Sequence, residues 1–102
     1  MKLIHIDSFQ SLQKQLIGHP KAYLLLYKSG SETSECALKS AIETVNEEVV
    51  FMVADVAKVH DIHTKYGIKS APILLSFSGG VLQNSFKGCN DVSFYHKILA
   101  QD

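Results

Sequence analysis

Short runs of apolar residues alternate with segments in which apolar residues recur every three or four positions. The strand-like runs cover residues 3–6, 22–27, 49–54, 73–77 and 81–87. Helices are predicted over residues 9–17, from about 32 to 46, over 60–66, and from residue 91 or 93 to about 100. Three strand–helix alternations, a hairpin and a closing helix predict an α/β fold. Its mixed four- or five-stranded sheet is expected to carry helices on both faces.

Two of the runs, residues 22–27 and 49–54, are apolar throughout and lack the alternation of a strand with one solvated face. They are therefore predicted to be the central strands. The first helix is expected to be capped by Asp7 or Ser8 and to bury the apolar stripe Phe9, Leu12, Leu16 and Ile17. The second helix is expected to bury the stripe Leu38, Ala41, Ile42 and Val45.

Composition narrows the classes of protein that the chain can represent. Its 102 residues are 46 % hydrophobic and 20 % charged, which is typical of one soluble globular domain spanning 1–102. Ten basic and ten acidic residues give a formal net charge of zero, which argues against nucleic acid or an anionic membrane as partner. The first seven residues are too short and too polar for a secretory signal, so a cytoplasmic location is expected.

The two cysteines, Cys36 and Cys89, lie 53 positions apart. They form neither a disulfide framework nor a zinc cluster, and in a reducing cytosol both are expected to be free thiols. His60 and His63 are spaced i, i+3 on the predicted third helix. Because two ligands do not make a metal site, we interpret them as solvated side chains. Neither a metal nor a cofactor is expected.

The segment Tyr66-Gly67-Ile68-Lys69-Ser70-Ala71-Pro72, followed by a strand and the turn Ser78-Gly79-Gly80-Val81, resembles the second half of a thioredoxin. The end of the last strand, Phe86-Lys87-Gly88, is similar as well, and the resemblance covers nearly the whole chain. It implies the thioredoxin fold and a cis Ala71–Pro72 bond, where the alternative is a trans proline that starts a strand. It also implies a groove that binds an extended substrate segment, bordered by Ala71, Pro72, Gly88 and Cys89.

The departures from the thioredoxin pattern lie where that family carries Cys-x-x-Cys. In an ungapped register the corresponding residues are Glu32-Thr33-Ser34-Glu35, and Cys36 lies one position beyond. Leu26 replaces the buried aspartate that handles protons in the family, and Lys28 and Ser31 replace the aromatic residues near the motif. A register shifted by one would place Cys36 at the second cysteine position. That register needs an insertion and disrupts the apolar stripe, so the ungapped one is favoured.

Cys36 has the strongest claim to a catalytic role, because the start of a helix favours a thiolate. Glu32 and Glu35 oppose this by raising a thiol's pKa, and the simpler alternative is a thiol without function. The two glutamates are themselves typical of a well-capped helix start, with Ser29-x-x-Glu32 in the form of a capping box. Cys89 is either a substrate-facing thiol beside the groove or a small apolar loop residue.

Three interpretations follow. The favoured one is a thioredoxin-like binding module without dithiol chemistry, which takes a protein or peptide partner at the Pro72 groove. The second is a monothiol oxidoreductase in which Cys36 forms mixed disulfides. The third is a Cys36–Cys89 redox pair across the groove, which needs the two sulfurs within reach of each other. The favoured interpretation predicts no thioredoxin-like exchange. A Cys36–Cys89 bond in the oxidised protein, or strong reductase activity lost in Cys36→Ser, would overturn this prediction and restore the enzyme interpretation.

Overall fold

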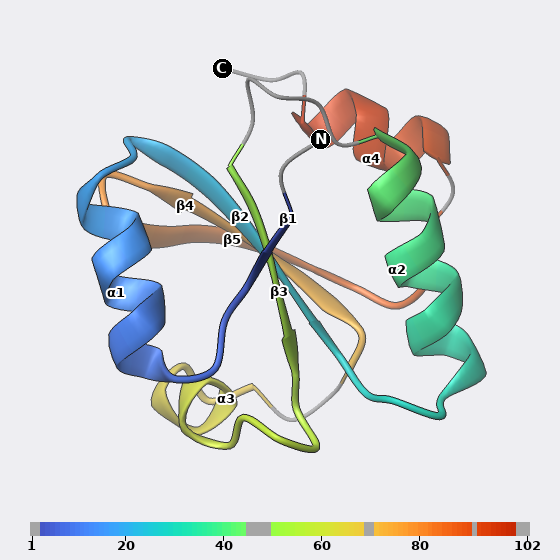
Figure 1. The fold of residues 1–102 in the computed structure, drawn as a ribbon. Coiled ribbons are helices and arrows are strands. Elements are labelled where there is room, and N and C mark those ends of the chain that lie inside the picture. Colours follow the sequence, from blue (N-terminus) through green and yellow to red (C-terminus); the bar gives the residue numbers. More distant parts are fainter. Residues whose placement is uncertain (1–2, 45–49, 69–70, 91, 100–102) are drawn as a thin grey trace.

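The computed structural model describes residues 3–44, 50–68, 71–90 and 92–99. Its elements in chain order are β1 (Leu3–His5), α1 (Phe9–Ile17), β2 (Lys21–Tyr27), α2 (Glu32–Thr44), β3 (Phe51–Asp55), α3 (Asp61–Lys65), β4 (Ile73–Ser78), β5 (Val81–Lys87) and α4 (Val92–Leu99). Figure 1 shows the sheet between two pairs of helices, α1 with α3 on one face and α2 with α4 on the other. This is the three-layer α/β architecture that the order of elements predicted.

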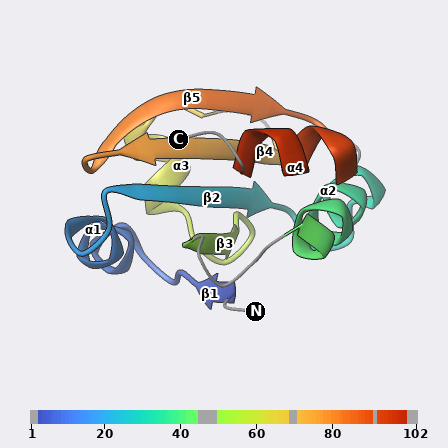
Figure 2. The same cartoon turned by 90° about the horizontal axis from the view of Figure 1, so that it is seen from above.

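The five strands form one mixed sheet in the order β1-β3-β2-β4-β5, which Figure 2 shows along its edge. The pairs β1–β3 and β2–β3 are parallel, and the pairs β2–β4 and β4–β5 are antiparallel. Both predicted central strands are therefore interior, with β2 in the middle of the sheet. Gly79 and Gly80 form the β4–β5 turn with φ of 60° and 82°, a region that glycine adopts without a Cβ penalty.

Side chains of the central strands alternate between two hydrophobic cores because successive residues of a strand point to opposite faces. On the α1/α3 side, Leu24 and Leu26 of β2 and Met52 of β3 pack with Leu12 and Ile62. On the α2/α4 side lie Tyr23, Leu25, Phe51, Val53, Ala37, Ala41 and Tyr95. Burial of both strand faces accounts for the unbroken apolar runs in the sequence.

The start of α1 was predicted correctly, whereas its end and the stripe of α2 differ from expectation. Ser8 caps α1, its Oγ accepting a hydrogen bond from the Ser11 N–H at 3.1 Å. Ile17, expected in the core, is 87 % exposed because it lies in the last turn, beyond the part of α1 that covers the sheet. In α2 the fully buried residues are Ser34, Ala37 and Ala41.

Leu38 and Ile42, predicted core positions, are half-buried, and Val45 lies outside the described residues. The small side chains of Ala37 and Ala41 allow α2 to lie close to the sheet, and the larger leucine and isoleucine flank the contact. The other helix and strand limits agree with prediction to within one or two residues where they are described. The ends predicted at residues 46, 49, 91 and 100 lie outside the described part. None of the described helices combines the length and apolar character needed to span a bilayer.

Candidate functional site

The loop that leaves β2 and the first turn of α2 are held by serine side chains. Ser31 caps the helix: its Oγ accepts from the Ser34 N–H at 3.3 Å, and its carbonyl accepts from the Glu35 N–H at 2.9 Å. The buried Ser34 Oγ in turn accepts from the Lys28 N–H at 3.0 Å. The capping box predicted at Ser29 is therefore wrong. The cap lies two residues later, and Ser29 has a different partner.

That partner is Asp55, the last residue of β3. Its carboxylate accepts from the Ser29 Oγ at 2.6 Å, from the Ala57 N–H at 2.9 Å and from the Ser29 N–H at 3.4 Å. The hydrogen bond from the Ser29 side chain is the main reason that the pKa of Asp55 lies below its usual value, and burial opposes this shift. Asp55 thus fastens the β2–α2 loop to the carboxyl end of the neighbouring strand.

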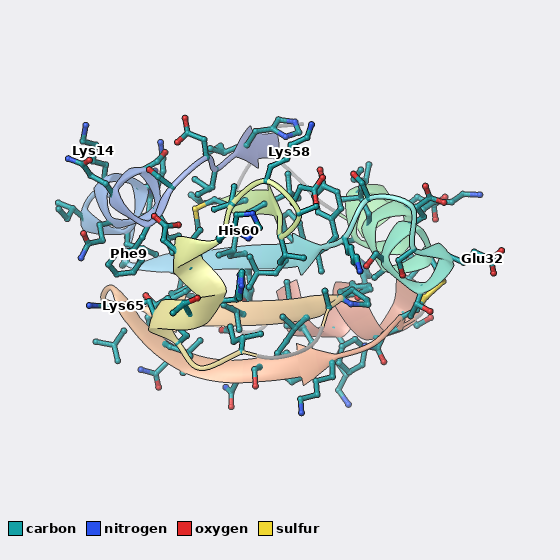
Figure 3. The ribbon with its side chains drawn as sticks, turned by 90° about the horizontal axis from the view of Figure 1, so that it is seen from below. Phe9, Lys14, Glu32, Lys58, His60 and Lys65 are labelled. Carbon is teal, nitrogen blue, oxygen red and sulfur yellow. A yellow bond between two sulfur atoms is a disulfide. The ribbon has the colours of Figure 1, made fainter. Side chains whose placement is uncertain are left out.

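The four positions that the resemblance predicts in place of a Cys-x-x-Cys motif do not form a polar reaction centre. Glu32, Thr33 and Glu35 are exposed, whereas Ser34 is buried and used as a hydrogen-bond acceptor. Figure 3 shows Glu32 pointing away from the ribbon. Leu26, beneath this loop at the end of β2, is fully buried in an apolar cluster. The structure therefore offers no buried carboxyl group at the Leu26 position to move a proton.

The prediction of two free thiols is wrong, because Cys36 and Cys89 form a disulfide. Their Cα atoms lie 5.7 Å apart, well within the range that a disulfide spans. The bond joins α2 to the loop between β5 and α4. The sequence offered this pair only as the third interpretation, because nothing in it fixes the distance between α2 and the loop after β5. Cys36 is exposed and Cys89 half-buried.

The predicted groove residues of the second half of the chain are brought together. The Ala71–Pro72 peptide bond is cis. Pro72 is buried, and its carbonyl accepts a hydrogen bond from the Gly88 N–H at 2.9 Å, which fixes the loop after β5 against the loop before β4. Gly88 has a φ of 83°, a conformation that a side chain would strain. Cys89 follows directly, so the disulfide lies one residue from this contact.

A pocket of about 590 Å³ lies beside Ala71, between the loops at the carboxyl ends of β2 and β3 and the helix α3. Its polar lining residues are Lys28, His60 and His63. In Figure 3, His60 lies on one side of α3, and Lys65 lies on the other side beside Phe9. Sequence analysis did not assign these three residues to a site. Their common signal is that all of them follow the carboxyl ends of neighbouring parallel strands, where ligands of α/β sheets bind.

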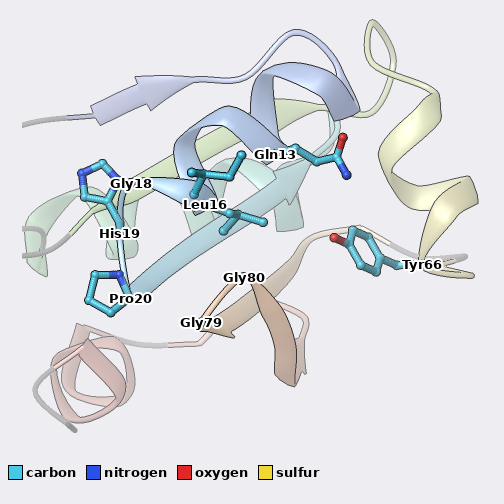
Figure 4. A pocket seen from close by; sticks show the side chains of 9 residues that line it. Gln13, Leu16, Gly18, His19, Pro20, Tyr66, Gly79 and Gly80 are labelled. Atoms are coloured by element: carbon cyan, nitrogen blue, oxygen red, sulfur yellow. The ribbon is translucent and has the colours of Figure 1, made fainter.

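A second pocket, of about 550 Å³, lies near the other end of β2 (Figure 4). Leu16, Pro20 and Tyr66 line it together with the turn Gly79–Gly80. Neither Cys36 nor any other predicted site residue contributes to its lining. Among the described residues, no cluster of three or more potential metal ligands occurs, and His60 and His63 form an edge-to-face ring pair with centroids 6.1 Å apart.

Solved structures similar to this one include several thioredoxins. Plasmodium falciparum thioredoxin has a TM-score of 0.84 at 16 % sequence identity, with 93 % of this chain and 95 % of that one covered. A mutant thioredoxin from Halobacterium salinarum has a TM-score of 0.86 at 15 % identity, covering 96 % and 88 %. Oxidised mitochondrial thioredoxin 3 from Saccharomyces cerevisiae has a TM-score of 0.84 at 14 % identity, covering 95 % and 92 %.

No protein-family model matches the sequence, and no curated protein matches it either. Identities of 14–16 % over nearly the full length establish the architecture and leave the activity open. The five-stranded mixed sheet, its helices on both faces and the structural neighbours agree: the chain has a thioredoxin-like fold.

Proposed function

We propose that this protein is a binding module that takes an extended segment of a protein or peptide partner at the groove formed by Ala71, Pro72, Gly88 and Cys89. Thioredoxin-like architecture suggests a redox-related origin for this surface. In the proposed function the surface is used for recognition, without thioredoxin-like dithiol exchange.

The single observation that carries the proposal is the state of the backbone at Ala71. Within the described part of the chain, its N–H and C=O make no hydrogen bond, although Ala71 borders a pocket and the adjacent β4 pairs on both sides. Free backbone groups beside a pocket are what an extended peptide uses when it adds to a protein by main-chain hydrogen bonds. The Gly88–Pro72 hydrogen bond holds the two sides of the groove in place before a partner arrives.

Panning a phage-displayed peptide library against the protein tests this directly. We expect enriched peptides to shift the backbone NMR signals of Ala71, Gly88 and Cys89. We expect Ala71→Arg, which fills the groove wall, to weaken their binding about tenfold or more. The matched control is Gln83→Arg on β5, an exposed position outside the groove residues, which should leave affinity unchanged. Peptides that bind equally to both variants, or no enrichment at all, would contradict the proposal.

The Cys36–Cys89 bond favours a second candidate, thiol–disulfide exchange by this pair. A thiolate of a partner or of glutathione would attack the exposed Cys36 Sγ, form a mixed disulfide and release Cys89 as a thiolate. A second thiol would then displace Cys36, so that two external thiols become one disulfide as the protein disulfide is reduced. Against this route, Glu32 and Glu35 place negative charge near Cys36. An insulin-type disulfide reduction assay with Cys36→Ser and Cys89→Ser variants separates the two functions.

For location we propose the cytoplasm, as expected from the sequence. A disulfide is rare there, since cytosolic thiols are kept reduced. A stable Cys36–Cys89 bond is therefore not expected in this compartment. Alkylating free thiols in intact cells measures whether the two cysteines are reduced there or joined. A bond that persists in the cell would contradict a reducing cytoplasm as the place of action.

A further inference from the structure

The pocket beside Ala71 has a polar rim that is entirely basic or neutral. Lys28 comes from the loop after β2, His60 from the turn before α3, and His63 from α3 itself. Of the seven described residues that line the pocket, none is acidic. A concave site with one fixed positive charge and two imidazoles attracts a negatively charged group more strongly than a neutral one.

The remaining wall is apolar and is shared with the groove of the proposed function. Val56 and Ile68 are half-buried and face the pocket together with Ala71. Val56 and Ile68 also pack against the core cluster on the α1/α3 side, so this wall is anchored to the interior. Because Ala71 borders both the pocket and the groove, a chain lying along the groove brings a side chain to the pocket mouth.

One polar atom of the pocket is left without a partner. The Nδ1 of His63 is buried and accepts or donates no hydrogen bond within the described residues. Such atoms are uncommon in folded proteins because an unpaired buried polar group costs roughly 1–3 kcal/mol. Because this atom is closed to solvent, a ligand in the pocket meets the exposed Lys28 and His60 side chains rather than the His63 Nδ1.

The nearby acidic side chains are engaged elsewhere and leave the basic rim available. Asp55 directs its carboxylate to Ser29 and the Ala57 N–H. Asp61 accepts a hydrogen bond from the Phe9 N–H at 3.0 Å, on the side of α3 that faces α1. Neither carboxylate lines the pocket, whose own polar lining consists of one lysine and two histidines.

We infer that the partner segment carries an acidic residue whose carboxylate binds in this pocket between Lys28, His60 and His63, with its aliphatic part against Val56 and Ile68. The inference rests on the proposed function and adds the chemistry of the partner to it. The occupant is an aspartate or glutamate side chain of an extended peptide, since the pocket opens beside the free backbone of Ala71.

NMR titration of the protein with two blocked peptides tests the inference. The first is acetyl-Ala-Val-Glu-Leu-Ala-amide, whose only carboxylate is the side chain, and the second has glutamine in place of glutamate. We expect the acidic peptide to bind about tenfold more tightly and to shift the signals of Lys28, His63 and Ala71. Lys28→Gln and His63→Gln should each remove most of this preference. Lys65→Gln is the matched control, because its ammonium lies over the Phe9 ring, 5.4 Å from the centroid, and does not line the pocket.

Equal affinity for the two peptides, or a preference that survives Lys28→Gln and His63→Gln, would overturn the inference. Peptide binding at Ala71, measured in the phage-display experiment, does not depend on this result. The inference can therefore fail while the proposed function holds. A third arm uses 3-phenylpropionate. Binding of this small carboxylate to the pocket without binding of the acidic peptide would also overturn the inference, since the occupant would then be a small molecule.

Discussion

Two segments meet at the same end of the sheet and have diverged from the thioredoxin pattern to different degrees. The loop before β4 keeps the Ala71–Pro72 sequence, a cis bond and a hydrogen bond from Gly88. The second segment is the first turn of α2. It carries the exposed residues Glu32 and Glu35 where the thioredoxin pattern has a dithiol. In the proposed function the first segment recognises a chain without chemistry, whereas dithiol exchange at the second would need sulfur atoms at specific positions.

The contrast shows that the fold depends on the two segments in different ways. The Pro72 carbonyl and Gly88 connect two loops, so changes there alter how the elements meet. The side chains of Glu32 and Glu35 point to solvent, and the helix is started by Ser31 and Ser34 instead. Side chains at the exposed positions 32 and 35 therefore matter little to the fold, whereas the Gly88–Pro72 hydrogen bond joins two loops of the structure.

The largest effect is expected from restoring the missing sulfurs. In a background of Cys36→Ser and Cys89→Ser, we change Glu32→Cys and Glu35→Cys. Side chains three residues apart on a helix have Cβ atoms about 5–6 Å apart, close enough for a disulfide after small adjustment. We expect insulin reduction to rise about tenfold or more above the background variant, because one thiol can then attack and the other can release the mixed disulfide.

The unmodified protein provides the comparison for that experiment. We expect its insulin reduction to equal that of the Cys36→Ser/Cys89→Ser variant. Strong activity of the unmodified protein that is lost in Cys36→Ser would show that the native pair is a working redox couple. Failure of the 32/35 pair to close, with Thr33→Cys and Cys36 closing instead, would favour the register shifted by one.

The native disulfide supplies the next largest effect. It links positions 53 apart in sequence, and in the chain-entropy description closing a loop of that length stabilises the fold by about 4 kcal/mol. We expect urea unfolding to show a loss of up to about this size in the Cys36→Ser/Cys89→Ser variant. Dithiothreitol should lower the stability of the unmodified protein by a similar amount and leave the variant unchanged. Equal stability with and without reductant would mean that the bond does not brace α2 against the β5–α4 loop.

Most patterns that are local in sequence were read correctly, the capping box at Ser29 being an exception, whereas several that depend on how distant segments meet were not. The apolar runs 22–27 and 49–54 predicted interior strands because burial on both faces removes alternation. Ser8 was identified as a cap candidate because its hydrogen bond reaches only Ser11. By contrast, Ile17 obeys helical spacing and yet lies beyond the sheet that would have covered it.

The candidate site shows the same division. Ala71, Pro72 and Gly88 were singled out because they stand within short motifs that resemble those of thioredoxins, and the structure joins Pro72 to Gly88 by a hydrogen bond. The Cys36–Cys89 pair, the Ser29–Asp55 contact and the pocket of Lys28 with two histidines each join residues far apart in sequence. For the Ser29–Asp55 contact a signal was available in the sequence. Ser29 follows the strand β2, and Asp55 ends β3, which lies parallel beside β2. The Cys36–Cys89 pair was considered only through the resemblance that places Cys89 beside the groove.

The smallest expected effect concerns Asp55, which fastens the β2–α2 loop to the end of β3 through Ser29. Asp55→Asn keeps the shape but weakens a charge-assisted hydrogen bond of 2.6 Å, so we expect a loss of about 1–2 kcal/mol at pH 7. The pKa of Asp55 is lowered in the folded protein from an ordinary value of 3.8, chiefly by the Ser29 hydroxyl. Its contribution to stability is therefore complete above that ordinary value and is lost as pH falls through the lower folded value.

Urea unfolding at a series of pH values checks this expectation for Asp55. The gap in stability between Asp55→Asn and the unmodified protein should narrow only in acid below about pH 3.8. Asp7→Asn, an exposed position with the same change of charge, is the control and should show little effect. A gap that stays constant down to low pH would mean that Asp55 acts through its shape, and the β2–α2 loop would then be held mainly by Ser31 and Ser34.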